Sequence, residues 1–301
     1  MEVQFDPASL VLVNIILATM MFGVSLSLRA DDFRRILTAP VAPVAGLVAQ
    51  FLLLPGLTCL GTWAFGVDPE LALGMILVAS CPGGTFSNVM TWLARANVAI
   101  SVSMTAVSSV AATVMTPLNF ALYGYLNPDT RGLLESIAIE PSSILTLVVL
   151  VLAVPLALGM WVAGRSPRFA AAAEKPFRIA ALIALLGFVA IAFGNNFDVF
   201  IGEFGTFFWL VVAHNLLALA LGNGVGRAMR LELADRRAVT LEVGIQNSGL
   251  GLVILFTFFP EFSGMILIAA FWGVWHLVSG LTLALVWSRS AGRAASAEVV
   301  P

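Results

Sequence analysis

Residues 80–88, SCPGGTFSN, interrupt an apolar run that otherwise has the length of a membrane-spanning helix. Pro82 lacks a backbone donor, and Gly83 and Gly84 have poor helix propensity, so the helix is predicted to open near the middle of the membrane. Backbone groups freed at that depth are tolerated only where they are buried in protein or face a wet cavity. Taken alone, such a break also fits an ordinary kink that neighbouring helices repair.

A second interruption lies at residues 244–251, GIQNSGLG, where three glycines surround the polar trio Gln246-Asn247-Ser248. Glu242, just before it, is the only formally charged residue that lies inside a long apolar run and more than four residues from its ends. An ionisable group in hydrocarbon costs several kcal/mol unless a partner or a wet cavity receives it, so it indicates a functional site.

Composition places both interruptions in an integral membrane protein, because 60% of the residues are hydrophobic and only 11% are charged. The apolar runs do not alternate with polar residues as barrel strands would, and each approaches the roughly 20 residues that a helix needs to cross a bilayer. The sequence therefore predicts an all-α membrane protein with nine spans, at residues 9–28, 40–65, 70–94, 98–125, 142–164, 177–197, 204–226, 234–258 and 261–288.

Loop charges predict the orientation of the chain. Of the 15 Lys and Arg residues, all but Arg131 lie in the loops and tail that follow odd-numbered spans or within the first four residues of the next span. Basic residues favour the cytoplasmic side, so we expect the N-terminus outside and the C-terminus in the cytoplasm of a cell membrane, most simply a bacterial inner membrane. The net charge of -2 argues against a nucleic-acid partner.

The two interruptions occupy spans of opposite direction, five steps apart along the chain. This arrangement is typical of inverted repeats, in which broken helices place a binding site at the membrane midplane. We therefore expect a transporter. We do not expect an enzyme, since the spans contain no paired carboxylates, no HExxH helix and no serine with a nearby base.

The side chains around the interruptions are oxygen donors. Ser101, Thr105 and Ser108 of the next span share one helix face, although hydroxyls there can instead bond to the carbonyl one turn earlier. Hard alkali cations prefer such oxygens, whereas a transition metal would call for His or Cys clusters. Cys59 and Cys81 are expected to be small buried side chains. His214 is expected to have a structural hydrogen bond, with substrate contact as the alternative.

Three motifs carry a family resemblance: CPGGTFSNVMT at residues 81–91, VAISVSMT at 98–105 and EVGIQNSGL at 242–250. With FGVSL at 22–26 and Trp275-His276, the chain resembles the bile acid:sodium symporter family, in the manner of its bacterial members similar to the apical bile acid transporter. The resemblance covers essentially the whole chain.

The resemblance implies two sodium ions and a small organic anion as the transported species. The residues that would hold the first ion are Ser87, Asn88, Ser101, Thr105 and Glu242. Those that would hold the second are Gln50, Gln246, Glu242 and the backbone carbonyls of Val243 and Ile245. The substrate would approach Thr85, Asn247 and His276, and Leu277 stands where bacterial relatives have Asn.

The resemblance also implies inverted repeats, here of four and five helices because the leading helix is missing. We expect a first repeat at residues 1–126, an outer loop at 127–141, a second repeat at 142–288 and a cytoplasmic tail at 289–301. A core domain would comprise about 69–125 and 234–288, and a panel domain about 9–65 and 142–226. Relative motion of the two would give alternating access.

Together these observations predict a sodium-coupled symporter of a bile-acid-like or smaller carboxylate or sulfonate, embedded in lipid and functional as a monomer. Two alternatives remain open at this stage. Glu242 could couple transport to protons, since a buried carboxylate readily takes one up. Cys81 could serve as a soft ligand in a metalloid efflux permease.

Overall fold

The computed structural model describes residues 15, 18–19, 21–23, 25–26, 34, 36–136, 149–195 and 197–297. Within these ranges the chain is helical, and its one β-type pairing is an isolated bridge between Gly83 and Gln246. Most of the predicted span 9–28 and the first part of 142–164 lie outside the described residues. The elements are α3 (Val41–Val48), η1 (Ala49–Leu53), α4 (Leu54–Ala64), α5 (Pro69–Ser80), α6 (Phe86–Leu93), α7 (Val98–Leu126), α8 (Pro128–Ser136), η2 (Val149–Ala153), α10 (Val154–Arg165), α11 (Pro167–Asn195), α12 (Phe197–Ala228), α13 (Leu233–Gly244), α14 (Ser248–Phe258) and α15 (Ser263–Ala297).

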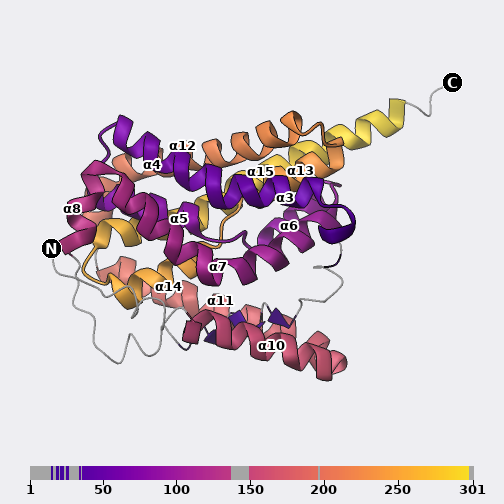
Figure 1. The fold of residues 1–301 in the computed structure, drawn as a ribbon, viewed down its shortest axis with the longest axis horizontal. Coiled ribbons are helices and arrows are strands. Elements are labelled where there is room, and N and C mark those ends of the chain that lie inside the picture. The colour runs from indigo at the N-terminus through magenta and orange to yellow at the C-terminus, as the bar shows by residue number, and fades with distance from the viewer. Residues whose placement is uncertain are drawn as a thin grey trace.

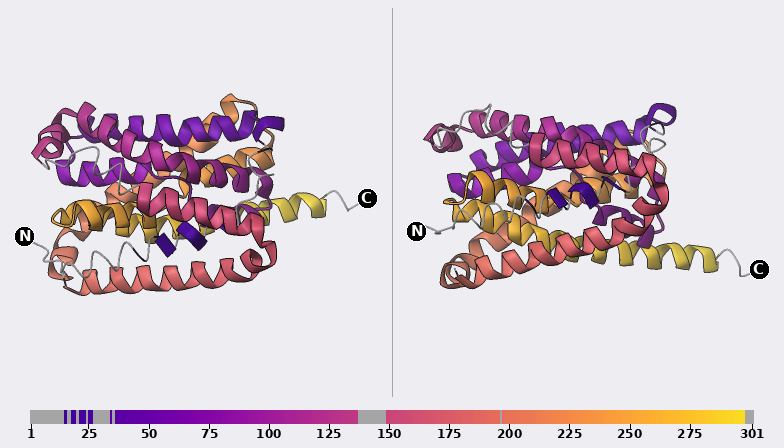
Figure 2. Two further views of the ribbon diagram at one scale, coloured as in Figure 1. Left: turned by 60° about the horizontal axis from the view of Figure 1, so that its bottom comes forward. Right: turned by 90° about the horizontal axis from the view of Figure 1, so that it is seen from below.

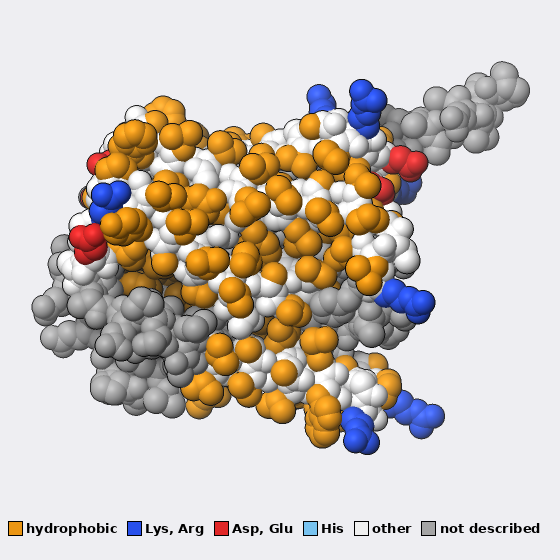
Figure 3. Space-filling model, in the orientation of Figure 1, with side chains coloured by type: hydrophobic (Ala, Val, Ile, Leu, Met, Phe, Trp, Pro, Cys, Tyr) orange, Lys and Arg blue, Asp and Glu red, His pale blue; other side chains and the backbone are white. Residues whose placement is uncertain are grey.

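The arrangement of these helices is that of a multi-pass membrane protein. Most run along the longest axis of the molecule (Figures 1 and 2). Four described segments are long and apolar enough to cross a membrane, and α5 and α14 are shorter apolar helices. Those four segments are Val41–Ala64, Val98–Leu126, Phe207–Ala228 and Ser263–Arg289. Hydrophobic side chains cover the middle of the face in Figure 3, and the charged side chains gather at its two ends. The predicted all-α class is confirmed.

Both predicted interruptions are present. Helix α5 ends at Ser80 and α6 begins at Phe86, with Cys81 extended at φ -73° and ψ 159°. Helix α13 ends at Gly244 and α14 begins at Ser248, with Ile245 extended at φ -117° and ψ 97°.

The second interruption is shorter than predicted. The sequence pattern extended it from Gly244 to Gly251, but Ser248–Gly251 already form the first turn of α14. The reason is the side chain of Asn247, whose oxygen accepts a hydrogen bond from the backbone N–H of Leu250 at 3.0 Å. Asparagine in this capping position stabilises a helix start, and here that outweighs the poor helix propensity of the glycines.

The first long helix contains a π-helical turn that the sequence reading missed. Within η1 the backbone N–H of Leu54 donates to the carbonyl of Ala49, five residues back. Pro55 explains the irregularity, because it has no N–H to offer Phe51 and its ring would press on that carbonyl in a regular α-helix. The same pattern recurs at η2, which precedes Pro155 by two residues.

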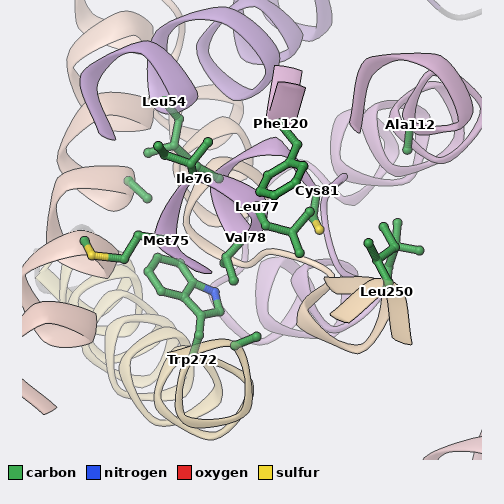
Figure 4. Packing of buried hydrophobic residues seen from close by; sticks show 14 of the residues in the cluster. Leu54, Met75, Ile76, Leu77, Val78, Cys81, Ala112, Phe120, Leu250 and Trp272 are labelled. Carbon is green, nitrogen blue, oxygen red and sulfur yellow. The ribbon is translucent and has the colours of Figure 1, made fainter. Parts of the chain in front are cut away.

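The core lies around α5, which is buried along most of its length. Figure 4 shows Ile76, Leu77 and Val78 at the centre, with Phe120 from α7 and Trp272 from α15 beside them. A helix that is apolar on all sides belongs in the interior, and α5 has this composition. The first half of the broken helix is thus part of a well-packed scaffold, which fixes the point where the interruption begins.

Candidate functional site

The two interruptions cross and pair through their backbones. The N–H of Gly84 donates to the carbonyl of Ile245 at 2.7 Å, and the N–H of Asn247 donates to the carbonyl of Pro82 at 2.8 Å. These two bonds form the antiparallel bridge around Gly83 and Gln246. These backbone groups have no partner within their own broken helix, and they pair with the other helix instead. Such pairing is required in a membrane interior, where water is not available to bond to them.

The glycine pair makes this close approach possible. A Cβ atom on Gly83 would overlap the carboxylate oxygen Oε1 of Glu242, and one on Gly84 would lie 3.0 Å from the backbone carbonyl oxygen of Gln246. Both spaces are too tight for a side chain. Gly83 and Gly84 thus serve the crossing by their size as well as by their low helix propensity.

Glu242 lies beside the crossing and is 0% exposed. Its Oε2 accepts hydrogen bonds from Ser87 Oγ at 2.5 Å and Ser101 Oγ at 2.8 Å, and its Oε1 accepts one from Thr105 Oγ1 at 2.6 Å. The structure thereby brings together three predicted ligands from α6 and α7 around the carboxylate of α13.

Asn88 completes this first group of oxygens. Its Oδ1 lies 2.8 Å from Ser101 Oγ and 3.3 Å from Thr105 Oγ1, and Thr105 Oγ1 is also 3.0 Å from the carbonyl of Ser101. Each hydroxyl has one proton, so it cannot donate to all of its neighbouring acceptors at once. Thr105 therefore lies within hydrogen-bond distance of both the carbonyl one turn earlier and the carboxylate of Glu242. Around its hydroxyl, acceptor atoms outnumber the protons that can be donated to them.

Within the described part of the chain the carboxylate has no basic partner. Among the described residues its hydrogen-bond partners are three hydroxyl groups and none is Lys, Arg or His. A buried ionised carboxylate without a counter-charge is costly, and neutral hydroxyl and amide oxygens do not supply one. An oxygen-only cluster with surplus lone pairs and one negative charge fits a hard monovalent cation.

The second predicted group includes Gln246, which is part of the crossing itself. Gln50 of η1 and Gln246 are both buried, and Nε2 of Gln50 lies 3.4 Å from Oε1 of Gln246. Gln246 Nε2 in turn donates to the carbonyl of Val243 at 2.8 Å. Oε1 of Gln50 is buried and has no hydrogen-bond partner among the described residues. An orphaned acceptor of this kind fits a site that a cation would complete.

The predicted substrate residues are less closely joined. Thr85 is half-buried at the start of α6, and the oxygen of Asn247 caps α14. His276 is buried on α15, where its Nδ1 has no hydrogen-bond partner in the part of the chain that the structure describes. A Cβ atom on Gly273 would lie 2.8 Å from Ser248 Oγ and one on Gly280 would lie 2.9 Å from Ile245 Cδ1, so this stretch of α15 packs on the crossing. Among the described residues, however, His276 makes no hydrogen bond to Thr85 or Asn247.

The other histidine has a structural partner. Nε2 of His214 lies 2.8 Å from Thr58 Oγ1, and its ring packs against Trp272 with centroids 4.6 Å apart. This is the hydrogen bond that we expected. The hydroxyl of Ser108, by contrast, donates to the carbonyl of Thr105 and does not reach the carboxylate.

Several residues beside the site were missed by the sequence reading. Thr91 donates to Ser101 Oγ at 3.3 Å, Asn215 donates to the carbonyl of Gly244 at 2.8 Å, and Asn119 donates to the carbonyl of Phe51 at 2.6 Å. A buried polar residue on an apolar span is the signal that could have found them. That signal does not say which carbonyl or hydroxyl is the partner.

Comparison with known proteins decides the family. The model of the sodium bile acid symporter family matches residues 14–203, more than half of the chain. The chain belongs to this family. Members and relatives are transporters and not enzymes, so the expectation of a membrane transporter from the motifs is confirmed.

Three relatives illustrate the likeness. The uncharacterized sodium-dependent transporter YocS of Bacillus subtilis (strain 168) is 32% identical over 279 residues, which are 92% of this chain and 83% of that protein. The probable chloroplastic sodium/metabolite cotransporter BASS1 of Arabidopsis thaliana is 33% identical over 279 residues, 90% of this chain and 65% of that protein. The sodium-dependent organic anion transporter of Mus musculus is 32% identical over 293 residues, 94% of this chain and 74% of that protein.

Proposed function

We propose that this protein is a symporter that couples the entry of a small organic anion to the movement of sodium ions. The observation that carries the proposal is the buried carboxylate of Glu242, held by three hydroxyl groups and lacking a basic partner among the described residues. A bound sodium ion would supply the missing positive charge. The sodium-dependent relatives support the same coupling.

Two sodium ions are proposed, one on each side of the crossing. The first would be held by the hydroxyl oxygens of α6 and α7, the amide oxygen of Asn88 and the carboxylate. The second would be held by the side-chain oxygens of Gln50 and Gln246, the carbonyls of Val243 and Ile245, and the same carboxylate. A carbonyl oxygen has two lone pairs, so each of these carbonyls can keep its present hydrogen bond and still bind an ion.

An anionic substrate is supported by the helix ends at the crossing. Helices α6 and α14 both begin there, and a helix N-terminus has partial positive charge and free N–H groups. We propose that Thr85, the amide nitrogen of Asn247 and His276 contact the carboxylate or sulfonate of the substrate. The unpartnered Nδ1 of His276 supports this role. One relative is named an organic anion transporter, and BASS1 is named a metabolite cotransporter.

Ion and substrate would stabilise one another through the crossing. Sodium would neutralise Glu242 and hold the extended segments in the paired form, which sets the direction of the half-helix N-termini. A coupling free energy of about 1–3 kcal/mol between the two sites would suffice, and it must act in both directions. The substrate should therefore tighten sodium binding as much as sodium tightens substrate binding.

The wider architecture stays part of the proposal: nine spans, inverted repeats, an outer N-terminus, a cytoplasmic C-terminus and a functional monomer. The packing favours one change in the proposed domain border. Segment 41–64 supplies Gln50 to the crossing, and α12 packs along α13 and supplies Asn215. We therefore propose that both move with the core domain, so that the panel comprises span 9–28, α10 and α11.

Sodium titration of the purified protein is the direct test. We expect the melting temperature to rise with NaCl and not with KCl or choline chloride, and organic anions to add stability only when sodium is present. Glu242→Gln should insert in the membrane but lose the sodium response and sodium-driven uptake into vesicles. Glu261→Gln, an exposed carboxylate outside the site, is the matched control.

Proton coupling is the second candidate, because a carboxylate without a basic partner can also be neutralised by a proton. Vesicles with a pH gradient and no sodium separate the two. Uptake of the identified anion under those conditions, with no effect of added sodium, would contradict the sodium proposal and leave Glu242 as a proton carrier.

A further inference from the structure

We propose that two buried asparagines outside the ion-binding oxygens, Asn119 and Asn215, are positioning residues for the second sodium site. Neither is among the predicted ligands. Each donates to a backbone carbonyl that a helix irregularity leaves without its usual partner, next to residues that would bind the ion. The inference rests on the proposed sodium coupling and adds to it the groups that hold the ligand-bearing backbone in place.

Asn215, on α12, holds the end of α13. In a continuous helix the carbonyl of Gly244 would accept from the N–H of Ser248, but that N–H donates to the carbonyl of Gln246 at 3.0 Å. Nδ2 of Asn215 donates to the Gly244 carbonyl instead, at 2.8 Å. Gly244 lies between Val243 and Ile245, whose carbonyls are the proposed ligands. The carbonyl that Asn215 holds thus belongs to the peptide unit between the two that carry the proposed ligands.

Asn119, on α7, does the same for the π-helical turn. In a regular helix the carbonyl of Phe51 would accept a hydrogen bond from the N–H of residue 55, and Pro55 has no N–H. Nδ2 of Asn119 donates to that carbonyl at 2.6 Å, and the hydroxyl of Tyr123, one turn later, donates to the carbonyl of Leu52 at 3.1 Å. Gln50, the residue before Phe51, thereby has its backbone fixed opposite Gln246.

The two asparagines act on opposite halves of one site. One fixes the helix that supplies Gln50 and the other fixes the segment that supplies the carbonyls, and Gln50 and Gln246 meet between them at 3.4 Å. Both asparagines are buried, so water does not replace the lost donor when either is removed. In metal sites, removing groups that orient the ligands typically lowers affinity 10- to 100-fold.

Asn215 is also joined to the proposed substrate side. Its Oδ1 accepts a hydrogen bond from Ser279 Oγ at 2.6 Å, and Ser279 lies on α15 three residues after His276. The chain Gly244, Asn215, Ser279 therefore connects the end of α13 to the helix that carries a proposed substrate contact. A change in the Gly244 carbonyl on sodium binding would be transmitted along it.

The experiment compares sodium titrations of Asn119→Ala, Asn215→Ala and Asn127→Ala, read as the sodium concentration that gives half of the rise in melting temperature. Asn127 is the matched control. It is similarly buried, donates to Thr62 Oγ1 and accepts from the N–H of Asp129, but it lies just after the C-terminal end of α7. Loss of packing alone lowers the melting temperature in every salt. Loss of a group that positions the sodium ligands also raises the half-saturating sodium concentration.

We expect that concentration to rise about 10-fold or more in Asn119→Ala and Asn215→Ala and to stay within twofold of the wild type in Asn127→Ala. If the wild-type protein shows no sodium-specific stabilisation, the proposed function fails. If the wild type responds and all three variants keep its half-saturating concentration, the inference alone is overturned. If either alanine variant does not fold, Ser279→Ala and Tyr123→Phe remove the adjoining hydrogen bonds with less damage. A rise in their half-saturating sodium concentration would support the inference, and no rise would overturn it.

Discussion

The two helix breaks have different origins. The first, between α5 and α6, contains Pro82 and two glycines, so its own sequence opens it. The second, residues 245–247, contains neither proline nor glycine. Its Ile245 carbonyl and Asn247 N–H pair with Gly84 and Pro82, and Asn215 donates to the carbonyl of Gly244 just before it. The first break is thus encoded locally and acts as a template, while the second takes its shape from packing against the first. The buried carboxylate of Glu242 lies beside the second break.

The largest expected effect comes from filling the space where the two breaks meet. Gly83→Ala should abolish the sodium-dependent rise in melting temperature, because the added methyl group would overlap the Glu242 carboxylate. Overpacking at such a site costs about 1–3 kcal/mol, and the crossing has to open to accept it.

Gly61→Ala is the control for that substitution. A Cβ atom there meets nothing within 4 Å, and the residue lies inside α4. Its sodium response should equal that of the wild type, and helix propensity should make it no less stable. A Gly83→Ala protein that still titrates with sodium like the wild type would contradict the tight crossing.

The same contrast explains what the sequence could predict. Both interruptions and the oxygens around Glu242 could be predicted because proline, glycine and a lone charge are local signals. The family motifs add the residues that are proposed as ion ligands. Thr91, Asn119 and Asn215 were missed because each bonds to a partner on another helix. Asn119 and Phe51, for instance, are 68 residues apart in the chain.

The end of the second interruption shows the limit of propensity. Glycines at 249 and 251 suggested that the break continued, yet the cap made by Asn247 starts α14 before them. The π-helical turn could not be predicted because its cause is only partly local. Pro55 removes one hydrogen bond, but whether the helix kinks, breaks or takes an extra residue depends on which side chain reaches the freed carbonyl.

A smaller effect is expected from a residue that supports the first group of oxygens. Thr91→Ala removes the hydroxyl that donates to Ser101 Oγ, so the proton of Ser101 is less well directed toward its acceptors. We expect the half-saturating sodium concentration to rise about 10-fold, the lower end of the range for groups that orient metal ligands.

Ser103→Ala is the matched control for Thr91→Ala. Its hydroxyl is buried on the same helix as Ser101 but donates to the carbonyl of Ala99, one turn earlier. The sodium titration of this variant should match the wild type. Equal shifts in both variants would mean that loss of any hydroxyl near α7 weakens the site, and the specific role of Thr91 would be wrong.

The smallest effect is expected from Pro82 itself, and it tests whether the template depends on its proline once the fold has formed. The crossing uses the carbonyl of Pro82, which alanine keeps, and Gly83 and Gly84 still provide the space. Pro82→Ala should therefore lower the free energy of unfolding by about 0.4–1 kcal/mol, because the unfolded chain gains freedom, and should leave the sodium titration unchanged.

Pro69→Ala, at the first residue of α5, should lose a similar amount and serves as the control. Reversible unfolding in mixed micelles measures both. If only Pro82→Ala raised the half-saturating sodium concentration 10-fold, the proline would be holding the ion-binding geometry directly, and the paired backbone of the second break would not be enough to maintain the first.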